Sequence, residues 1–223
     1  MVNGTRATLG DSIKPSSDRV EVDRVQVNLD PDVRYYALHK PRGIVTTMRD
    51  PQGRVDIRTL LPADGPRVVP VGRLDRDSEG LLLLTNDGEL ANRILHPRYA
   101  VEKEYLAEVR GNPTQRQLAR LRAGVRLEDG PARAIRARAV ARAGQRGAVR
   151  LVVTEGRKRE VRRLLAAVGL PVTRLIRLRV GPIALGGLRP GAIRPLTARE
   201  IRELARVAGR VALGPRGSEG GRS

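Results

Sequence analysis

The 223-residue sequence contains no cysteine, which excludes disulfide bonds and metal sites built on thiolates. It has only two histidines, His39 and His96, and their separation along the chain argues against a histidine-based zinc site. Phenylalanine and tryptophan are also absent, and aromatic residues make up only 2% of the chain. The hydrophobic fraction of 40% is sufficient for a core, which leucine, valine, isoleucine and alanine must fill.

Long apolar runs and negative charge are also scarce. No segment approaches the roughly 18 apolar residues of a membrane-spanning helix, and the N-terminus lacks the apolar core of a signal peptide. We therefore expect a soluble, cytoplasmic protein without a membrane partner. The 24 acidic residues stand against 43 Lys and Arg, a net charge of +19. Arginine-rich composition alone does not create such an excess, so the charge predicts a nucleic-acid partner.

The most informative segment is 72–88, which reads G-R-L-D-R-D-S-E-G-L-L-L-L-T-N-D-G. Its four leucines, 81–84, lie between a glycine and a turn signal, which is typical of a strand buried on both faces. Residues 68–74 are also strand-like, and Pro70 favours an edge position. A charged loop thus connects two pieces of sheet, a place where functional residues are often found.

The acidic residues of this loop, Asp75, Asp77 and Glu79, allow several interpretations. Such residues are often turn formers or helix caps. Their spacing matches the first half of a calcium-binding loop, but Asn86 stands where that loop requires a bidentate glutamate. A magnesium-dependent nuclease is a further alternative, because clustered carboxylates can hold that ion.

Periodicity and capping residues predict the remaining elements. Apolar patterns predict strands at 33–39, 44–48, 103–109, 148–154 and 172–180. Helices are predicted at 89–95, at 114–122, after Gly156 and at 198–207, with Asp87, Thr114 and Thr197 as N-caps. The segment 125–140 alternates Arg and Ala, and its pairing stays open.

The helix after Gly156 combines an apolar face with a strongly basic one. Lys158 and Arg162, and likewise Arg159 and Arg163, are like charges at i, i+4, and each pair costs a few tenths of a kcal/mol in isolation. We expect an anionic partner to offset this repulsion, either RNA phosphates, a buried carboxylate, or both. A solvated basic face is the alternative.

The strand at 103–109 places Lys103 and Tyr105 on one face. Tyr105 is one of only four aromatic residues in the chain. It is a candidate surface for stacking a base, an interaction worth roughly 1–3 kcal/mol. Filling the core is the alternative role.

Four segments resemble, in the same order, the motifs of the RsuA/RluB family of rRNA pseudouridine synthases. They are Y-A-L-H-K-P-R-G at 36–43, the loop at 72–88, K-E-Y at 103–105 and E-G-R-K-R-E-V-R-R at 155–163. The resemblance covers about residues 33–205. It implies the α+β fold of that family, a mixed, mainly antiparallel sheet with flanking helices. It also implies the isomerisation of a uridine to pseudouridine, with no cofactor and no metal.

The resemblance also implies roles for individual residues. Asp75 would be the catalytic carboxylate, which either attacks the anomeric carbon of the ribose or removes the proton from the neighbouring sugar carbon. Arg162 would pair with Asp75 and keep it ionised, and Tyr105 would stack on the flipped uracil. Arg73 would fill the gap that the nucleotide leaves. Three further residues are placed to hold phosphates: Lys103, Arg157 and Arg159.

We predict three parts along the chain. Residues 1–28 open with the hairpin signal Val-Asn-Gly and resemble the second half of an S4 RNA-binding domain, whose helical first half is not recognised; a disordered tail is the alternative. Residues 33–208 would form the catalytic domain. Residues 209–223 would be a disordered basic tail.

The expected partner is a stem-loop of rRNA, and the protein is expected to act as a monomer. The segment 174–182 resembles the RluB branch more than RsuA, which favours large-subunit (23S) rRNA over 16S rRNA. The target uridine stays open. The alternative function is that of a non-catalytic rRNA-binding or ribosome-assembly factor.

Overall fold

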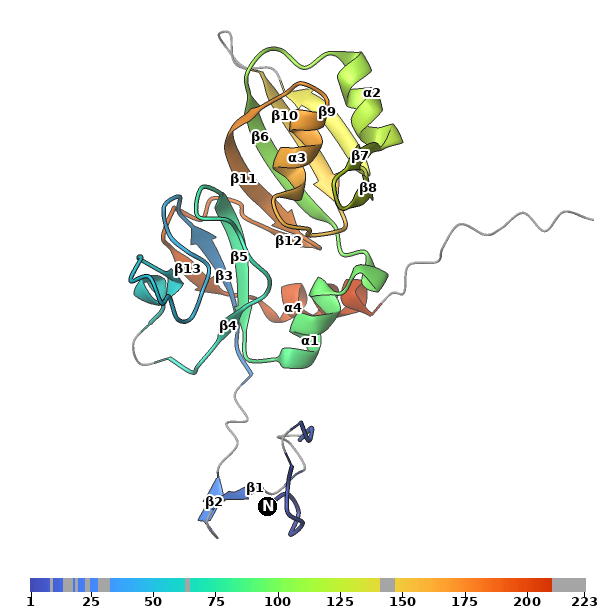
Figure 1. Ribbon diagram of the computed structural model, residues 1–223. Coiled ribbons are helices and arrows are strands. Elements are labelled where there is room, and N and C mark those ends of the chain that lie inside the picture. Colours follow the sequence, from blue (N-terminus) through green and yellow to red (C-terminus); the bar gives the residue numbers. More distant parts are fainter. Residues whose placement is uncertain are drawn as a thin grey trace, which may run out of the picture.

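One mixed sheet organises the computed structural model, which describes residues 1–8, 10–13, 18, 20–22, 25–27, 33–62, 65–140 and 147–209. Among these residues nine strands form the sheet, in the order β13-β3-β5-β11-β6-β10-β9, with β4 added to β5 and β12 to β11 (Figure 1). Their bounds are β3 (Tyr35–Lys40), β4 (Val69–Pro70), β5 (Glu79–Thr85), β6 (Lys103–Val109), β9 (Arg136–Val140), β10 (Ala148–Val153), β11 (Val172–Val180), β12 (Ile183–Ala184) and β13 (Ile193–Pro195). The pairs are antiparallel except β5 with β11, which confirms the predicted mixed, mainly antiparallel sheet.

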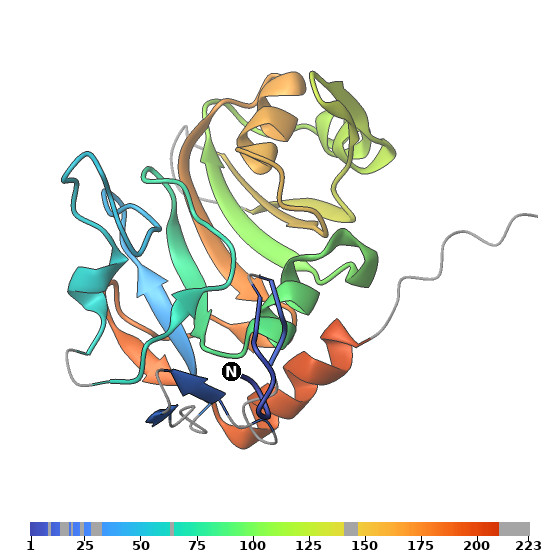
Figure 2. The ribbon, with the colours of Figure 1, turned by 60° about the horizontal axis from the view of Figure 1, so that its bottom comes forward.

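Helices cover the sheet in two groups (Figures 1 and 2). The helices α1 (Gly88–Leu95) and α4 (Ala198–Ala208) pack into one apolar cluster. The helices α2 (Gln115–Ala123) and α3 (Glu160–Ala167) pack into a second, beside the hairpin of β7 (Val125–Leu127) and β8 (Gly130–Ala132). The three predicted N-caps accept hydrogen bonds from the first turns of α1, α2 and α4.

Strand β5 is buried along its whole length, as the leucine run predicts. Leu82 and Leu84 belong to the cluster that includes α2 and α3, whereas Leu81 and Leu83 belong to the cluster that includes α1 and α4. The strand is therefore apolar on both faces, and it carries the end of the acidic loop into the centre of the sheet.

The contact between β5 and β11 requires a glycine. Gly80 lies opposite Arg177 in the parallel register and has a φ of +108°. A Cβ atom at Gly80 would lie 2.3 Å from the carbonyl oxygen of Arg177 and 2.6 Å from its nitrogen. Only glycine permits both this backbone conformation and this approach of the two strands.

Two predicted strands differ from the structure. Residues 68–74 contain only the two-residue β4, because Pro70 has no N–H to donate and the chain turns at Gly72, with a φ of +77°. The strand expected at 44–48 is reduced to a single bridge between Val45 and Asp56. The chain beyond it is instead shaped by local polar contacts.

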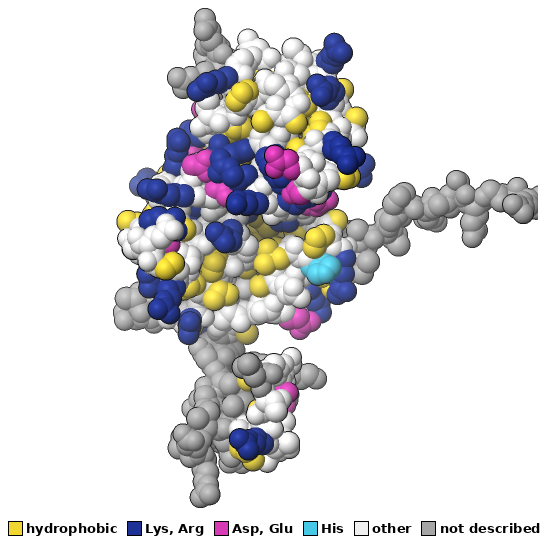
Figure 3. Space-filling view, in the orientation of Figure 1, with side chains coloured by type: hydrophobic (Ala, Val, Ile, Leu, Met, Phe, Trp, Pro, Cys, Tyr) yellow, Lys and Arg dark blue, Asp and Glu magenta, His cyan; other side chains and the backbone are white. Residues whose placement is uncertain are grey.

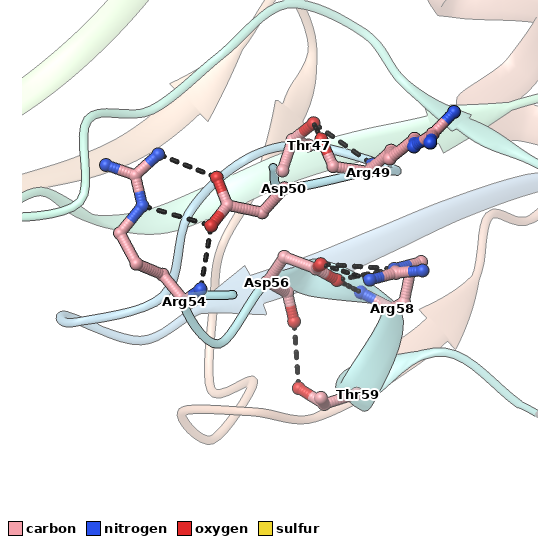
Figure 4. Close-up of polar contacts among 7 residues, drawn as sticks. All are labelled: Thr47, Arg49, Asp50, Arg54, Asp56, Arg58 and Thr59. Atoms are coloured by element: carbon pink, nitrogen blue, oxygen red, sulfur yellow. Dashed lines mark hydrogen bonds and ion pairs between the residues drawn. The ribbon is translucent and has the colours of Figure 1, made fainter. Parts of the chain in front are cut away.

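These contacts lie after β3, in the loop that leads to the short 3₁₀ helix Ile57–Leu60 and in that helix itself (Figure 4). Arg54 donates to both carboxylate oxygens of Asp50, and Arg58 does the same to Asp56. Asp56 also caps the 3₁₀ helix by accepting from the Arg58 N–H at 2.9 Å. Such local bonds compete with a strand ladder.

The N-terminal part contains short paired segments. Val2 pairs with Thr5 across Asn3 and Gly4, whose positive φ angles of 49° and 84° confirm the expected hairpin turn. Strands β1 (Val20–Val22) and β2 (Val25–Val27) pair antiparallel. The S4-like character of residues 1–28 stays a prediction. The predicted tail, apart from Gly209, lies outside the described residues, among which no helix is long and apolar enough to cross a membrane.

We predict that Gly80→Ala lowers the free energy of unfolding by roughly 3 kcal/mol or more, because it combines backbone strain with overpacking. Gly88→Ala is the matched control, since a Cβ atom there meets nothing within 4 Å and the residue begins a helix. We expect it to be neutral or stabilising by about 0.4–1 kcal/mol. Urea titration of both variants would measure the difference, and equal stabilities would contradict the requirement for Gly80.

Candidate active site

A cleft of about 540 Å³ lies where the acidic loop before β5 meets β6, β11 and the start of α3. Six of the seven residues singled out from the sequence line it: Arg73, Asp75, Lys103, Tyr105, Arg157 and Arg159. Lys and Arg side chains gather across the middle of this face of the molecule, with Asp and Glu among them (Figure 3). The structure therefore brings together residues that are up to 86 positions apart, from Arg73 to Arg159.

The loop that carries Asp75 is braced by the turn after β3. The Thr46 hydroxyl donates to the Leu74 carbonyl at 2.7 Å and accepts from the Leu74 N–H at 3.2 Å. The Gly43 N–H donates to the Arg76 carbonyl at 2.7 Å, and Arg76 Nε returns a bond to the Gly43 carbonyl at 3.1 Å. Asp75 thus sits between two anchored neighbours, which fixes its backbone.

The arginine pairing differs from the prediction. Arg162 binds Asp77 rather than Asp75, with Nη2 3.2 Å from Oδ2 and 2.9 Å from the Asp77 carbonyl oxygen. The guanidinium nearest to Asp75 is that of Arg159, whose Nη1 lies 3.7 Å from Asp75 Oδ2. The reason is their position on α3. Arg162 is the third residue of α3, its side chain is only 12% exposed and it binds the backbone of the loop, whereas Arg159 is the residue just before the helix.

Acidic side chains pair with the arginines at the start of α3, but they are not the buried carboxylate we expected, because the side chains of Asp77 and Asp129 are 37% and 43% exposed. Arg159 forms two hydrogen bonds to Asp77, at 3.0 and 3.1 Å, and Arg163 forms two to Asp129, both at 2.8 Å. Burial acts to raise the pKa of Asp77, but the hydrogen bond from Arg159 and the charge of Arg162 outweigh it and leave that pKa below its usual value.

Two of the residues expected to contact phosphates, Lys103 and Arg157, are buried or half-buried. Lys103 is only 6% exposed, and its ammonium group donates to the carbonyls of Val101 and Thr154, both at 3.2 Å. Its position at the buried end of β6 fits the floor of the cleft better than the phosphate contact we predicted. Arg157 is half-buried and binds Glu155 and Asp129, whereas Arg73 is exposed at the edge of the cleft.

Tyr105 is 8% exposed and lines the cleft from β6, directly opposite Arg177 of β11. It also belongs to one of the apolar clusters, so that both roles considered from the sequence apply. The cleft therefore combines a carboxylate, a neighbouring guanidinium and an aromatic ring. This combination suits acid–base or nucleophilic chemistry at a sugar whose planar base lies against the ring.

Sequence reasoning gave no role to three buried charged residues near the cleft, Lys40, Glu160 and Arg177. Lys40 is fully buried and donates to the carbonyls of Pro41 and Ile44. Glu160 and Arg177 line the cleft itself. The signal for Arg177 was present, because the alternation of β11 from Leu175 places it on the buried face, where an arginine is unusual.

The chain is similar in sequence and in fold to RNA pseudouridine synthases. Residues 34–167 match the family model of RNA pseudouridylate synthases. The chain is 44% identical to an uncharacterized RNA pseudouridine synthase of Mycobacterium leprae, over 90% of this chain and 80% of the relative. It is 39% identical to the ribosomal large subunit pseudouridine synthase B of Bacillus subtilis, over 93% and 85%. A crystal structure of a pseudouridylate synthase superposes with a TM-score of 0.71 at 29% identity, covering 92% of this chain and 87% of the other.

Fold and cleft, together with these matches, define an RNA-modifying isomerase of the pseudouridine synthase class. Relatives of about 40% identity that cover more than nine-tenths of the chain are synthases of the RluB type. The chain therefore belongs to the RsuA/RluB family of RNA pseudouridine synthases.

The buried lysine under the loop predicts a pH dependence of stability. Burial lowers the pKa of Lys40 to about 8, although Asp75, Asp77 and Glu79 raise it and Arg177 lowers it further. Between about pH 8 and the ordinary value of 10.5, only the unfolded chain binds the proton, so that stability rises with pH. At about 1.4 kcal/mol per pKa unit, this contributes on the order of 3 kcal/mol.

We expect the free energy of unfolding of the wild type, relative to Lys40→Met, to increase as the pH rises from about 8 to about 10.5. Urea titrations across this range would measure it. Lys158→Met, at an exposed residue, is the control and should give a profile parallel to that of the wild type. A parallel profile for Lys40→Met would contradict the prediction.

Proposed function

We propose that this protein converts a uridine of large-subunit rRNA to pseudouridine, with Asp75 as the catalytic carboxylate. The observation that carries the proposal is the position of Asp75 in the cleft. It lies between anchored loop residues, 3.7 Å from the guanidinium of Arg159, in a cavity that Tyr105 also lines. Its side chain is 36% exposed, which leaves it accessible to a nucleotide that enters the cleft.

The reaction breaks the bond between N1 of uracil and C1′ of the ribose and joins C5 to C1′ instead. N1 gains a proton and C5 loses one, so no oxidant or reductant is needed. Asp75 either attacks C1′ and is later displaced by C5, or removes the proton from C2′ to leave an unsaturated sugar and returns that proton to C2′ when C5 joins C1′. In either route Asp75 reacts as a carboxylate, and Arg159 Nη1 lies 3.7 Å from its Oδ2.

The remaining residues serve to bind the RNA. Tyr105 stacks on the flipped uracil, and Arg73, exposed at the edge of the cleft, fills the gap in the RNA stack. Arg159 and Arg157 provide positive charge for phosphates at the mouth of the cleft. Arg162 acts indirectly, because it fixes Asp77 and thereby the loop that positions Asp75.

A loop or single-stranded segment of rRNA is the substrate that fits, since bases in a duplex are not accessible for this chemistry. The net charge of +19 supports a polyanionic substrate. The choice of the large subunit is supported by the RluB-type relatives, three of which are named ribosomal large subunit pseudouridine synthase B. The protein is expected to act as a monomer and without a cofactor.

We predict that the purified protein introduces one new pseudouridine into deproteinised large-subunit rRNA and none into small-subunit rRNA. Carbodiimide treatment followed by primer extension would map the modified position. Modification of small-subunit rRNA alone would contradict the choice of substrate but not the activity, whereas no new pseudouridine in either RNA would contradict the proposed function.

Asp75→Asn should abolish the reaction, with a loss of more than about 10³-fold in the single-turnover rate, while RNA affinity stays within a few-fold of the wild type. Asp77→Asn is the matched control in the same loop, because it removes a partner of Arg159 and Arg162 but not the reacting carboxylate. We expect a partial loss there. A fully active Asp75→Asn variant would exclude Asp75 as the catalytic group.

A further inference from the structure

Two buried polar atoms on the cleft have no hydrogen-bond partner among the described residues. They are Oε2 of Glu160 and Nη2 of Arg177. The two side chains are only 5% and 4% exposed, and both residues line the cleft. A buried hydrogen-bonding group without a partner costs about 1–3 kcal/mol, more if it is charged, so native proteins seldom leave one without a reason.

The two orphaned groups share their surroundings with Lys103. Arg177 and Lys103 lie on the neighbouring strands β11 and β6, two residues apart in the register around Tyr105. Glu160 begins α3 on the same cleft. Within the described part of the chain no ion pair joins Glu160 to either cation, so an internal salt bridge does not account for the three charges.

Arg177 and Lys103 each use only some of their N–H donors in hydrogen bonds to the protein. Arg177 donates from Nε to the Leu81 carbonyl at 2.7 Å, which leaves Nη2 unpaired. Lys103 gives two bonds to the carbonyls of Val101 and Thr154, and an ammonium group has three N–H donors. The residues that line the cleft beside Tyr105 thus include one carboxylate and two cations.

Electrostatics support a common environment for the three groups. Burial, followed by the charge of Arg177, lowers the pKa of Lys103 to about 8, and Glu160 opposes this shift. Burial, followed by the charge of Glu155, raises the pKa of Glu160, and Arg157 and Lys103 oppose it. Burial therefore disfavours the charged forms of Lys103 and Glu160, and the attraction between these two groups opposes that effect.

Uracil carries the complementary pattern on its hydrogen-bonding edge, with acceptors at O2 and O4 on either side of the N3–H donor. We propose that Glu160, Arg177 and Lys103 read this edge of the flipped base, with the carboxylate accepting from N3–H and the cations donating to O2 and O4. This inference rests on the proposed function and assigns the groups that select uracil. Cytosine would place the lone pair of N3 against the carboxylate and its amino group against a cation.

We expect hydrogen bonds to these buried groups to discriminate strongly between uracil and its analogues. A site built to hydrogen-bond its substrate rejects an analogue that lacks the group, because buried atoms of the protein are then left unpaired. A methyl group on N3 of the target uridine removes the one donor that Glu160 requires, but leaves O2, O4, C5 and the sugar unchanged. Such a substrate isolates the contact between Glu160 and the base.

The test is a double-mutant cycle between protein and RNA. Wild type and Glu160→Ala are each assayed, by kcat/KM, on a stem-loop substrate with uridine or 3-methyluridine at the target position. We expect the methyl group to cost the wild type more than about 10²-fold and the variant less than about 10-fold, because the shortened side chain has no acceptor to leave unpaired and has room for the methyl group. Glu89→Ala, on the exposed side of α1, is the control and should behave as the wild type.

Equal losses in wild type and Glu160→Ala would overturn this inference and leave the proposed function intact. No conversion of the uridine substrate by the wild type would overturn the proposed function itself, and this inference with it. Glu160→Val, which lacks the acceptor and all side-chain atoms beyond Cγ, replaces Ala if melting shows that Ala impairs folding, with the same expected result. Glu160→Gln, which keeps an acceptor, should restore most of the sensitivity to the methyl group.

Discussion

The approach of β5 to β11 at Gly80 is the constraint on which the site depends. It is the parallel contact in an otherwise antiparallel sheet, and a side chain at Gly80 would collide with the backbone of Arg177. This contact places the start of β5, and hence the loop of Asp75, beside the strand that carries Arg177. Because β6 pairs with the other edge of β11, Tyr105 and Lys103 reach the same cleft.

The three carboxylates of the acidic loop differ in the contacts that they make. Asp77 is bound by Arg159 and Arg162, and Glu79 is bound by Arg174, so these two carboxylates hold the loop against α3 and β11. Asp75 is left with a single, longer contact to Arg159 at 3.7 Å. Its side chain is 36% exposed, so that it remains accessible from the cleft, as the proposed catalytic role requires.

The elements with strong local signals were predictable. The two-sided apolar run predicted the buried β5, and the capping residues predicted α1, α2 and α4. Local sequence patterns did not predict the secondary structure correctly where non-local or polar contacts determine it. The strand expected at 44–48 gave way to bonds such as those of Asp56, and the segment 125–140 acquired its hairpin and edge strand only through its neighbours in the fold. For the site, ordered motifs identified the family and six residues that line one cleft.

By itself, the sequence determined the family, the fold class and the loop that carries the candidate carboxylate, because these depend on short-range patterns and ordered motifs. The tertiary structure decided which arginine faces which aspartate, and it placed Lys103 on the cleft floor rather than at its mouth. It also brought Glu160 and Arg177 to the cleft, each with one buried polar atom that has no hydrogen-bond partner among the described residues. Ion pairing and burial depend on distances between segments far apart in the chain, which residue spacing does not specify.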